Sequence, residues 1–91
     1  MLESKVQASI KKKLKQRGWT VLKIIQLSEN GYPDLLCLKH PAQVLWVEVK
    51  RPGEEPAPLQ QHRHKQLREM GFEVMVFDND RLRSIFKFLN C

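Results

Sequence analysis

Two apolar runs separated by only three residues restrict the fold of this chain more than any other feature. The runs are residues 34–39 (DLLCLK) and residues 43–50 (QVLWVEVK), and a tight turn at residues 40–42 joins them. Short, continuous apolar runs bounded by turn residues are typical of buried strands. Because a parallel connection needs about a dozen residues or more, these two runs are expected to pair antiparallel as a hairpin.

The segment before the hairpin predicts a helix and then a strand. From Leu2 to Leu14 an apolar residue recurs every four positions and lysines fill much of the remainder, which indicates an amphipathic helix over residues 1–17. Gly18 suits the end of that helix. Residues 20–26 (TVLKIIQ) are rich in β-branched side chains and predict a strand, which the turn-forming residues 28–31 follow.

The segment after the hairpin predicts a loop, a helix, a strand and a last helix. Residues 51–58 hold three prolines and cannot sustain a ladder, so the next helix starts at Pro58 or Leu59 and runs to Met70, with Leu59, Leu67 and Met70 facing inward. Residues 72–77 (FEVMVF) form the next strand, expected to lie parallel to a neighbour through a right-handed crossover. A final helix begins at residue 78 or 79. The expected class is α/β, in the order αβββαβα, with helices covering a mixed sheet.

Composition bounds the function classes. A chain of 91 residues holds one small domain, here residues 1–91, whose limited core would benefit from a dimer interface. Its net charge of +6 favours a polyanionic partner, either nucleic acid or an anionic membrane surface. The sequence shows no apolar stretch near 18 residues and no secretory leader, so we expect a cytoplasmic protein with no membrane partner. Two cysteines make neither a disulfide framework nor a CxxC metal pair.

A charged pair inside the second strand of the hairpin is not explained by packing. Alternation places Glu48 and Lys50 on one face with Trp46, at the end of an apolar strand where an unpartnered charge is costly. Each charge therefore needs a salt bridge, solvent or a metal ion. Asp34 follows the rigid turn Gly31-Tyr32-Pro33 and begins the other strand, so it can bring a second carboxylate close to Glu48.

Two converging carboxylates predict a site for a hard cation. Mg²⁺ is held by one or two carboxylates with waters and substrate phosphate, which suits Asp34 and Glu48 together with the backbone carbonyl of Val49. Lys50 beside the ion would orient or help to deprotonate an attacking water, or would neutralise charge on the phosphate. The reaction class is metal-assisted phosphodiester hydrolysis.

These residues also resemble a known nuclease family. Pro33-Asp34 and Glu48-x-Lys50 resemble the PD-(D/E)xK superfamily and its restriction-endonuclease-like fold. The closer resemblance is to the VRR-NUC family (virus-type replication and repair nucleases). It rests on residues 31–35 (GYPDL), residues 46–50 (WVEVK), residues 58–60 (PLQ) and the L-x-x-x-G ending at Gly71. The resemblance covers nearly the whole chain and matches the minimal, stand-alone form found in phages and bacteria.

The resemblance implies roles for particular residues. Asp34 and Glu48 would ligate Mg²⁺ or Mn²⁺, Lys50 would act in catalysis, and Gln60, with Gln61 as the alternative, would support the site. Glu3, the one acidic residue in the first helix, would extend the metal site. The family further implies cleavage of branched DNA such as four-way junctions by a homodimer.

Basic residues are candidates for contact with the DNA backbone, although a charge run also commonly only solubilises a helix. The candidates are Lys11, Lys12, Lys15, Arg51 and Arg63. His62 and His64 point to different sides of a helix and are expected at the surface or on a phosphate, not in a zinc site. Trp46 fits a core position, and Tyr32 fits either the turn or a DNA contact.

Three functions remain open from the sequence. The first is a Mg²⁺- or Mn²⁺-dependent DNA endonuclease, and the second is a non-catalytic nucleic-acid-binding module with a basic surface. The third is a small homodimeric interaction protein whose charges are structural. A dimer would use the apolar C-terminal helix, residues 82–89, or an exposed edge of the sheet.

Overall fold

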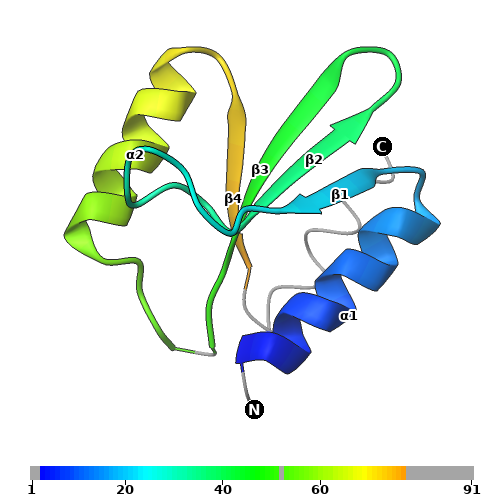
Figure 1. The fold of residues 1–91 in the computed structure, drawn as a ribbon, viewed down its shortest axis with the longest axis horizontal. Coiled ribbons are helices and arrows are strands. Elements are labelled where there is room, and N and C mark those ends of the chain that lie inside the picture. The colour runs from blue at the N-terminus through cyan, green and yellow to red at the C-terminus, as the bar shows by residue number, and fades with distance from the viewer. Residues whose placement is uncertain (1–2, 52, 78–91) are drawn as a thin grey trace.

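The computed structural model describes residues 3–51 and 53–77, with the backbone alone at residues 3 and 4, and it places a four-stranded mixed sheet between two helices (Figure 1). In chain order the elements are α1 (Glu3–Gln16), β1 (Thr20–Lys23), β2 (Leu35–Lys39), β3 (Gln43–Val49), α2 (Pro58–Glu69) and β4 (Glu73–Phe77). The strand order is β1-β2-β3-β4. The expected C-terminal helix lies outside the described residues.

The sheet confirms the two pairings expected from the sequence. β2 and β3 form the antiparallel hairpin, and β4 lies parallel to β3 after the crossover through α2. β1 adds to the other side of the hairpin, antiparallel to β2. The fold is therefore a mixed α/β sheet with helices on its faces.

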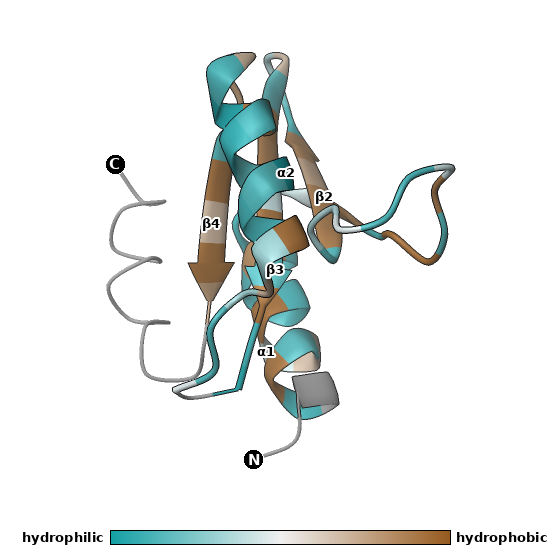
Figure 2. Ribbon diagram, turned by 90° about the vertical axis from the view of Figure 1, so that its left-hand side faces the viewer, coloured by the Kyte–Doolittle hydropathy of each residue, from teal (hydrophilic) through white to brown (hydrophobic). Residues whose placement is uncertain are grey.

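α1 covers one face of the sheet with side chains at four-residue spacing. Val6, Ile10 and Leu14 are completely buried. They share one core with strand residues that all point to this face: Val21, Leu35, Cys37, Leu45, Val47, Val49 and Phe77. Because strand side chains alternate, the residues between these point to the opposite face, where α2 lies. Figure 2 shows mostly hydrophobic strands beside a mostly hydrophilic α2.

β1 is shorter than the sequence predicts, because its partner strand runs out. The register sets Lys23 opposite Leu35, and the N–H of Ile24 then donates to the carbonyl of Asp34 at 2.8 Å. The residue before Asp34 is Pro33, which has no N–H with which to continue the ladder. Residues 24–26 therefore leave the sheet, although their composition favours a strand.

The expected inward face of α2 was partly wrong. Leu67 is buried as predicted, but Met70 is 63% exposed and Leu59 is 45% exposed. α2 turns His64 toward the sheet instead, and it ends at Glu69 with Met70 as its C-cap. A helix with so few apolar residues can bury a polar side chain against the sheet when that side chain has a buried hydrogen-bond partner.

Within the described residues, neither helix has the length and apolar composition that crossing a bilayer would require.

Candidate metal and catalytic site

Asp34 lies directly before β2, at the register position opposite Glu48. Leu35 pairs with Val47, so one further step of the same register sets the two carboxylates across from each other. The Oδ2 atom of Asp34 accepts a hydrogen bond of 2.8 Å from the backbone N–H of Val49. An oxygen of the Asp34 side chain thus takes the place that a backbone carbonyl would have at the end of the ladder. This bond holds Asp34 beside Glu48, as the sequence predicts.

Glu48 is completely buried and contacts a histidine from α2. Its Oε1 atom lies 3.3 Å from Nε2 of His64, whose ring is 3% exposed. A carboxylate in the ionised form that binds a cation only accepts hydrogen bonds, so this pair would then need the proton on Nε2 of His64. The partner that a charge at the end of this strand requires is therefore supplied in part by the crossover helix.

The expectation that His64 lies at the surface or on a phosphate was wrong. Burial lowers the pKa of His64 below its usual value, and the positive charges of Arg68 and Lys50 lower this pKa further. The negative charge of Asp34 opposes that shift only in part. These contributions together favour the neutral form of the His64 ring. His62 is exposed, as expected.

Lys50 extends the face that carries Glu48 and is largely covered. Its backbone N–H donates to the carbonyl of Phe77 at 2.8 Å, so β3 stays paired with β4 one residue past its end. Its ammonium lies 3.9 Å from Oε1 of Glu54, and its side chain is 12% exposed. Glu54 makes its closer contact with Arg51 at 2.8 Å, and that hydrogen bond is the main cause of the lowered pKa of Glu54.

The oxygen atoms at the end of the hairpin fit a hard cation. Two carboxylates opposite each other repel in the absence of a positive charge between or beside them. The N–H and C=O of a strand residue point to the same edge, so the carbonyl of Val49 shares the side on which its N–H meets Asp34. The described residues hold no group of three or more His, Cys, Asp or Glu that could bind a metal ion. Carboxylate and carbonyl oxygens are ligands that suit a hard divalent cation whose other positions are filled by water and phosphate.

The two glutamines at the start of α2 both bond to the loop before the helix. Oε1 of Gln60 accepts from the N–H of Ala57 at 2.8 Å and so caps the start of the helix, although Ala57 has no side chain that could return the bond. Nε2 of Gln61 donates to the carbonyl of Pro56 at 2.8 Å. The acceptor of Gln60 is thus used by the helix cap. Glu3 begins α1, and its side chain is outside the described part of the chain.

Arg63 anchors the loop between β1 and β2 to α2. Its guanidinium donates to the carbonyl of Asn30, to Glu29 and to Gln66 at 2.9, 3.1 and 3.0 Å. The same group lies 5.2 Å from the centre of the Tyr32 ring. The sequence predicts a DNA contact for Arg63, whereas in the structure the N–H groups of its guanidinium bond to these three residues of the protein.

The anchored loop leads directly into Asp34. Tyr32 packs near Trp46, with 6.1 Å between the ring centres, and Trp46 is half-buried rather than a fully buried core residue. Gly31 adopts a positive φ of 89°, and a Cβ there would lie 2.7 Å from Cγ of Leu59. The position of Asp34 thus depends on contacts between this loop and α2.

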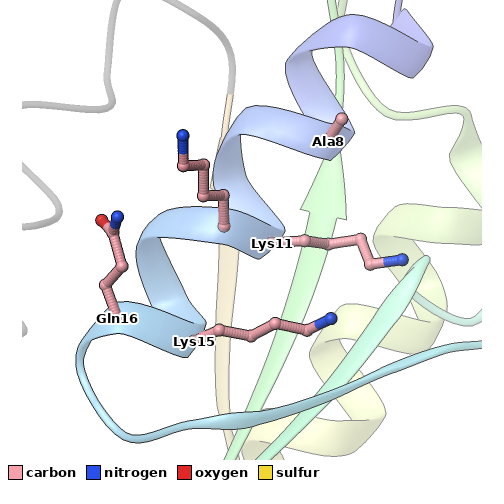
Figure 3. Close-up of a pocket in the computed structure, with 5 residues that line it drawn as sticks. Ala8, Lys11, Lys15 and Gln16 are labelled. Atoms are coloured by element: carbon pink, nitrogen blue, oxygen red, sulfur yellow. The ribbon is translucent and has the colours of Figure 1, made fainter.

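The lysines of α1 that were expected to contact DNA lie together. Lys11, Lys12 and Lys15, the α1 basic face, line one pocket with Ala8 and Gln16. Figure 3 shows the side chains of Lys11 and Lys15 extending in the same direction from the helix. Arg51, the fourth basic candidate, is 57% exposed despite its bond to Glu54.

Comparison with known proteins identifies the family. No family model matches the chain. Over 88 residues, which cover 97% of this chain and 95% of the relative, it is 30% identical to a protein named "Putative nuclease p44" of Acyrthosiphon pisum secondary endosymbiont phage 1. A solved structure described as "VRR_NUC domain" superimposes with a TM-score of 0.84 at 28% identity, covering 93% of this chain and 94% of that one. The chain therefore belongs to the VRR-NUC family of nucleases.

Proposed function

We propose that this protein is a Mg²⁺- or Mn²⁺-dependent endonuclease that hydrolyses phosphodiester bonds in DNA. The observation that carries the proposal is the placement of Asp34 and Glu48 across from each other at one end of the hairpin. Lys50 lies two residues farther along β3, on the face of Glu48. The same three residues carry the resemblance to the family.

The metal ion would be held by the two carboxylates and the carbonyl of Val49, with Glu3 as a further ligand from α1. When bound, the ion supplies a Lewis acid that polarises the scissile phosphate and lowers the pKa of a bound water. The two carboxylates would hold the ion in a defined position. Asp34 is fixed by its bond to Val49 at the end of the ladder, and Glu48 is fixed by its burial. Lys50 offers a positive charge to the phosphate oxygens or to the attacking water. Gln60 would support the site through its amide nitrogen, since its oxygen caps α2.

The DNA backbone would be held by basic residues on α1 and after β3. Lys11, Lys12, Lys15 and Arg51 supply positive charge, and the chain has a net charge of +6. Arg63 would act from a distance by holding the loop that carries Asp34, instead of binding phosphate directly. Contacts of this kind give salt-dependent affinity without reading the base sequence.

We further propose that the enzyme acts as a homodimer on branched DNA such as four-way junctions. Two copies related by a two-fold axis would place two sites on opposed strands, as paired incisions require. Apolar side chains exposed on the β1–β2 side of the sheet and in the loop after β1 would serve as the interface. They are Leu22, Ile25, Leu27 and Leu38.

Sedimentation tests this interface separately from catalysis. The wild-type chain is expected to sediment as a dimer at micromolar concentration, and Leu22→Glu combined with Leu38→Glu is expected to sediment as a monomer. Gln16→Glu is the matched control, because it adds a charge at an exposed position of α1, which covers the other face of the sheet. A wild-type chain that sediments as a monomer would refute the dimer.

Cleavage assays test the activity. Purified protein is incubated with labelled four-way junction, flap and linear duplex DNA in the presence of Mg²⁺, Mn²⁺ or EDTA. We expect metal-dependent cutting, with the junction cut fastest, and no cutting in EDTA. Glu48→Ala, and Lys50→Ala as a second variant, are expected to lose at least 100-fold in rate while binding the same DNA.

Each outcome separates the open functions. Binding by the wild-type chain with no cutting in any metal would establish the non-catalytic module. Cutting that survives in Glu48→Ala would exclude the proposed metal site. Equal rates on junction and linear duplex would leave a nuclease without structure selectivity, and a lack of DNA affinity at low salt would favour the interaction protein.

A further inference from the structure

We propose that His64 is a positioning residue that orients the carboxylate of Glu48 for metal binding. This inference rests on the proposed function and adds to it a residue from the crossover helix. It starts from the hydrogen bond between Nε2 of His64 on α2 and Oε1 of Glu48 in the candidate site, at 3.3 Å.

Both side chains of this hydrogen bond are buried. The His64 side chain is 3% exposed and the Glu48 side chain is not exposed, so water does not compete for either group. A buried carboxylate with a fixed donor on one oxygen has a restricted orientation, while it retains lone pairs that can bind a cation. A hydrogen bond in such a place directs a metal ligand and changes metal affinity without touching the ion.

The composition of α2 supports a role for the histidine beyond packing. Only His64 and Leu67 are buried among the residues of this helix, and the apolar Leu59 and Met70 stay largely exposed. A helix selected only to cover the sheet would turn its apolar residues inward. α2 instead presents its polar buried side chain at the position that faces Glu48.

A neighbouring side chain of α2 has a different bond. Gln60, one helical turn earlier on the same side of α2, uses its oxygen to cap the helix. His64, in contrast, bonds to a candidate metal ligand.

The test compares three substitutions at one position. His64→Gln keeps an N–H donor near the place of Nε2, His64→Asn keeps the amide but is too short to reach, and His64→Leu removes the donor. Mn²⁺ affinity is measured by electron paramagnetic resonance in a Lys50→Ala background, with linear duplex DNA present, so that the DNA stays intact. Cleavage against Mg²⁺ concentration is measured separately with Lys50 present.

We expect His64→Leu and His64→Asn to weaken Mn²⁺ binding about 10- to 100-fold. The Mg²⁺ concentration for half-maximal cleavage should rise by a similar factor. His64→Gln should restore both quantities to within about threefold of wild type. His62→Gln, the same substitution two residues away at an exposed position, should leave the Mn²⁺ affinity unchanged.

Several results would overturn the proposal. If all three variants lower the thermal midpoint but bind Mn²⁺ as wild type does, His64 serves stability alone. Should His64→Leu fail to fold, the comparison of Gln with Asn decides, and equal Mn²⁺ affinity in those two refutes the role. If the wild-type chain neither binds Mn²⁺ nor cuts DNA, the proposed function itself fails, which is distinct from a wild-type nuclease indifferent to His64.

Discussion

The carboxylate of Asp34 combines a structural bond with the charge that a cation would need. Its hydrogen bond to the N–H of Val49 ends the β2–β3 ladder, and its register position faces Glu48. An amide can replace the acceptor but not the charge, so substitution separates the two roles.

Asp34→Asn is expected to keep its bond to Val49, and its free energy of unfolding should stay within about 1 kcal/mol of wild type. Cleavage should nevertheless fall at least 100-fold, because the cation loses a charged ligand. Asp34→Ala should lose the activity and about 1–2 kcal/mol of stability, since the N–H of Val49 is left without its acceptor. Urea unfolding and cleavage assays measure both quantities. Activity retained in Asp34→Asn would exclude Asp34 as a metal ligand.

Cys37 gives a prediction that depends on pH. Burial raises the pKa of its thiol to about 12, above the value near 8.5 expected in the unfolded chain. The folded state therefore binds more protons above about pH 8.5, and stability should fall as the pH rises past that value. In a Cys91→Ser variant, which leaves Cys37 as the sole thiol, a thiol reagent should react at pH 8 only after unfolding. Rapid labelling of the native protein would contradict this burial.

At this scale the sequence predicts Asp34, Glu48 and Lys50 correctly as neighbours, because a hairpin and strand alternation fix where they lie. It does not predict His64. The orientation of α2 decides which of its side chains faces the sheet, and its few apolar residues do not encode that orientation. The available signal was the spacing of Gln60, His64 and Leu67, which share one side of a helix.

Among the elements, α2 carries a cap that can be tested. Oε1 of Gln60 accepts from the N–H of Ala57. Gln60→Glu keeps such an acceptor, so the free energy of unfolding should change little, whereas Gln60→Ala should cost about 1 kcal/mol. If the amide nitrogen also supports catalysis, Gln60→Glu should slow cleavage while the protein remains stable. Unchanged cleavage in Gln60→Glu would reduce the role of Gln60 to capping.

The loop that ends at Asp34 depends on Gly31. Gly31→Ala meets a positive φ and Leu59, whereas Gly71→Ala, the matched control, has a φ of 95° and open space around the added methyl group. We expect Gly31→Ala to cost about 2–3 kcal/mol and Gly71→Ala about 1 kcal/mol. Cleavage should fall further in Gly31→Ala, because Asp34 follows this loop. Equal effects on stability and cleavage would show that the contact with Leu59 is unimportant.

The elements also show where sequence reasoning stops. The hairpin, the start of α2 at Pro58 and the parallel pairing of β4 follow from turn residues and crossover length. The length of β1 does not, since residues 24–26 have strand composition and leave the sheet only because the partner strand ends at Asp34. Such limits depend on pairing between distant segments, which local propensity does not contain.

For the whole molecule, the positive charge predicts how DNA affinity responds to salt. Replacing Lys11, Lys12 and Lys15 together by Gln should weaken binding and lower the slope of log affinity against log salt by about 2–3. Lys23→Gln, an exposed lysine on β1, is the control and should change the slope by less than about 1. Fluorescence anisotropy at several salt concentrations measures both slopes. An unchanged slope in the triple variant would remove the α1 basic face from the DNA interface.

The candidate site and the β2–β3 turn lie at opposite ends of the hairpin. Asp34 and Glu48 lie at one end, while the exposed turn at residues 40–42 lies at the other, five residues of β2 away. At about 3.3 Å per residue, this strand keeps the turn roughly 15 Å or more from the carboxylates. A fluorophore or affinity tag attached at that turn would therefore leave the two carboxylates undisturbed, and with Leu38 only two residues away it would also report on pairing of two copies.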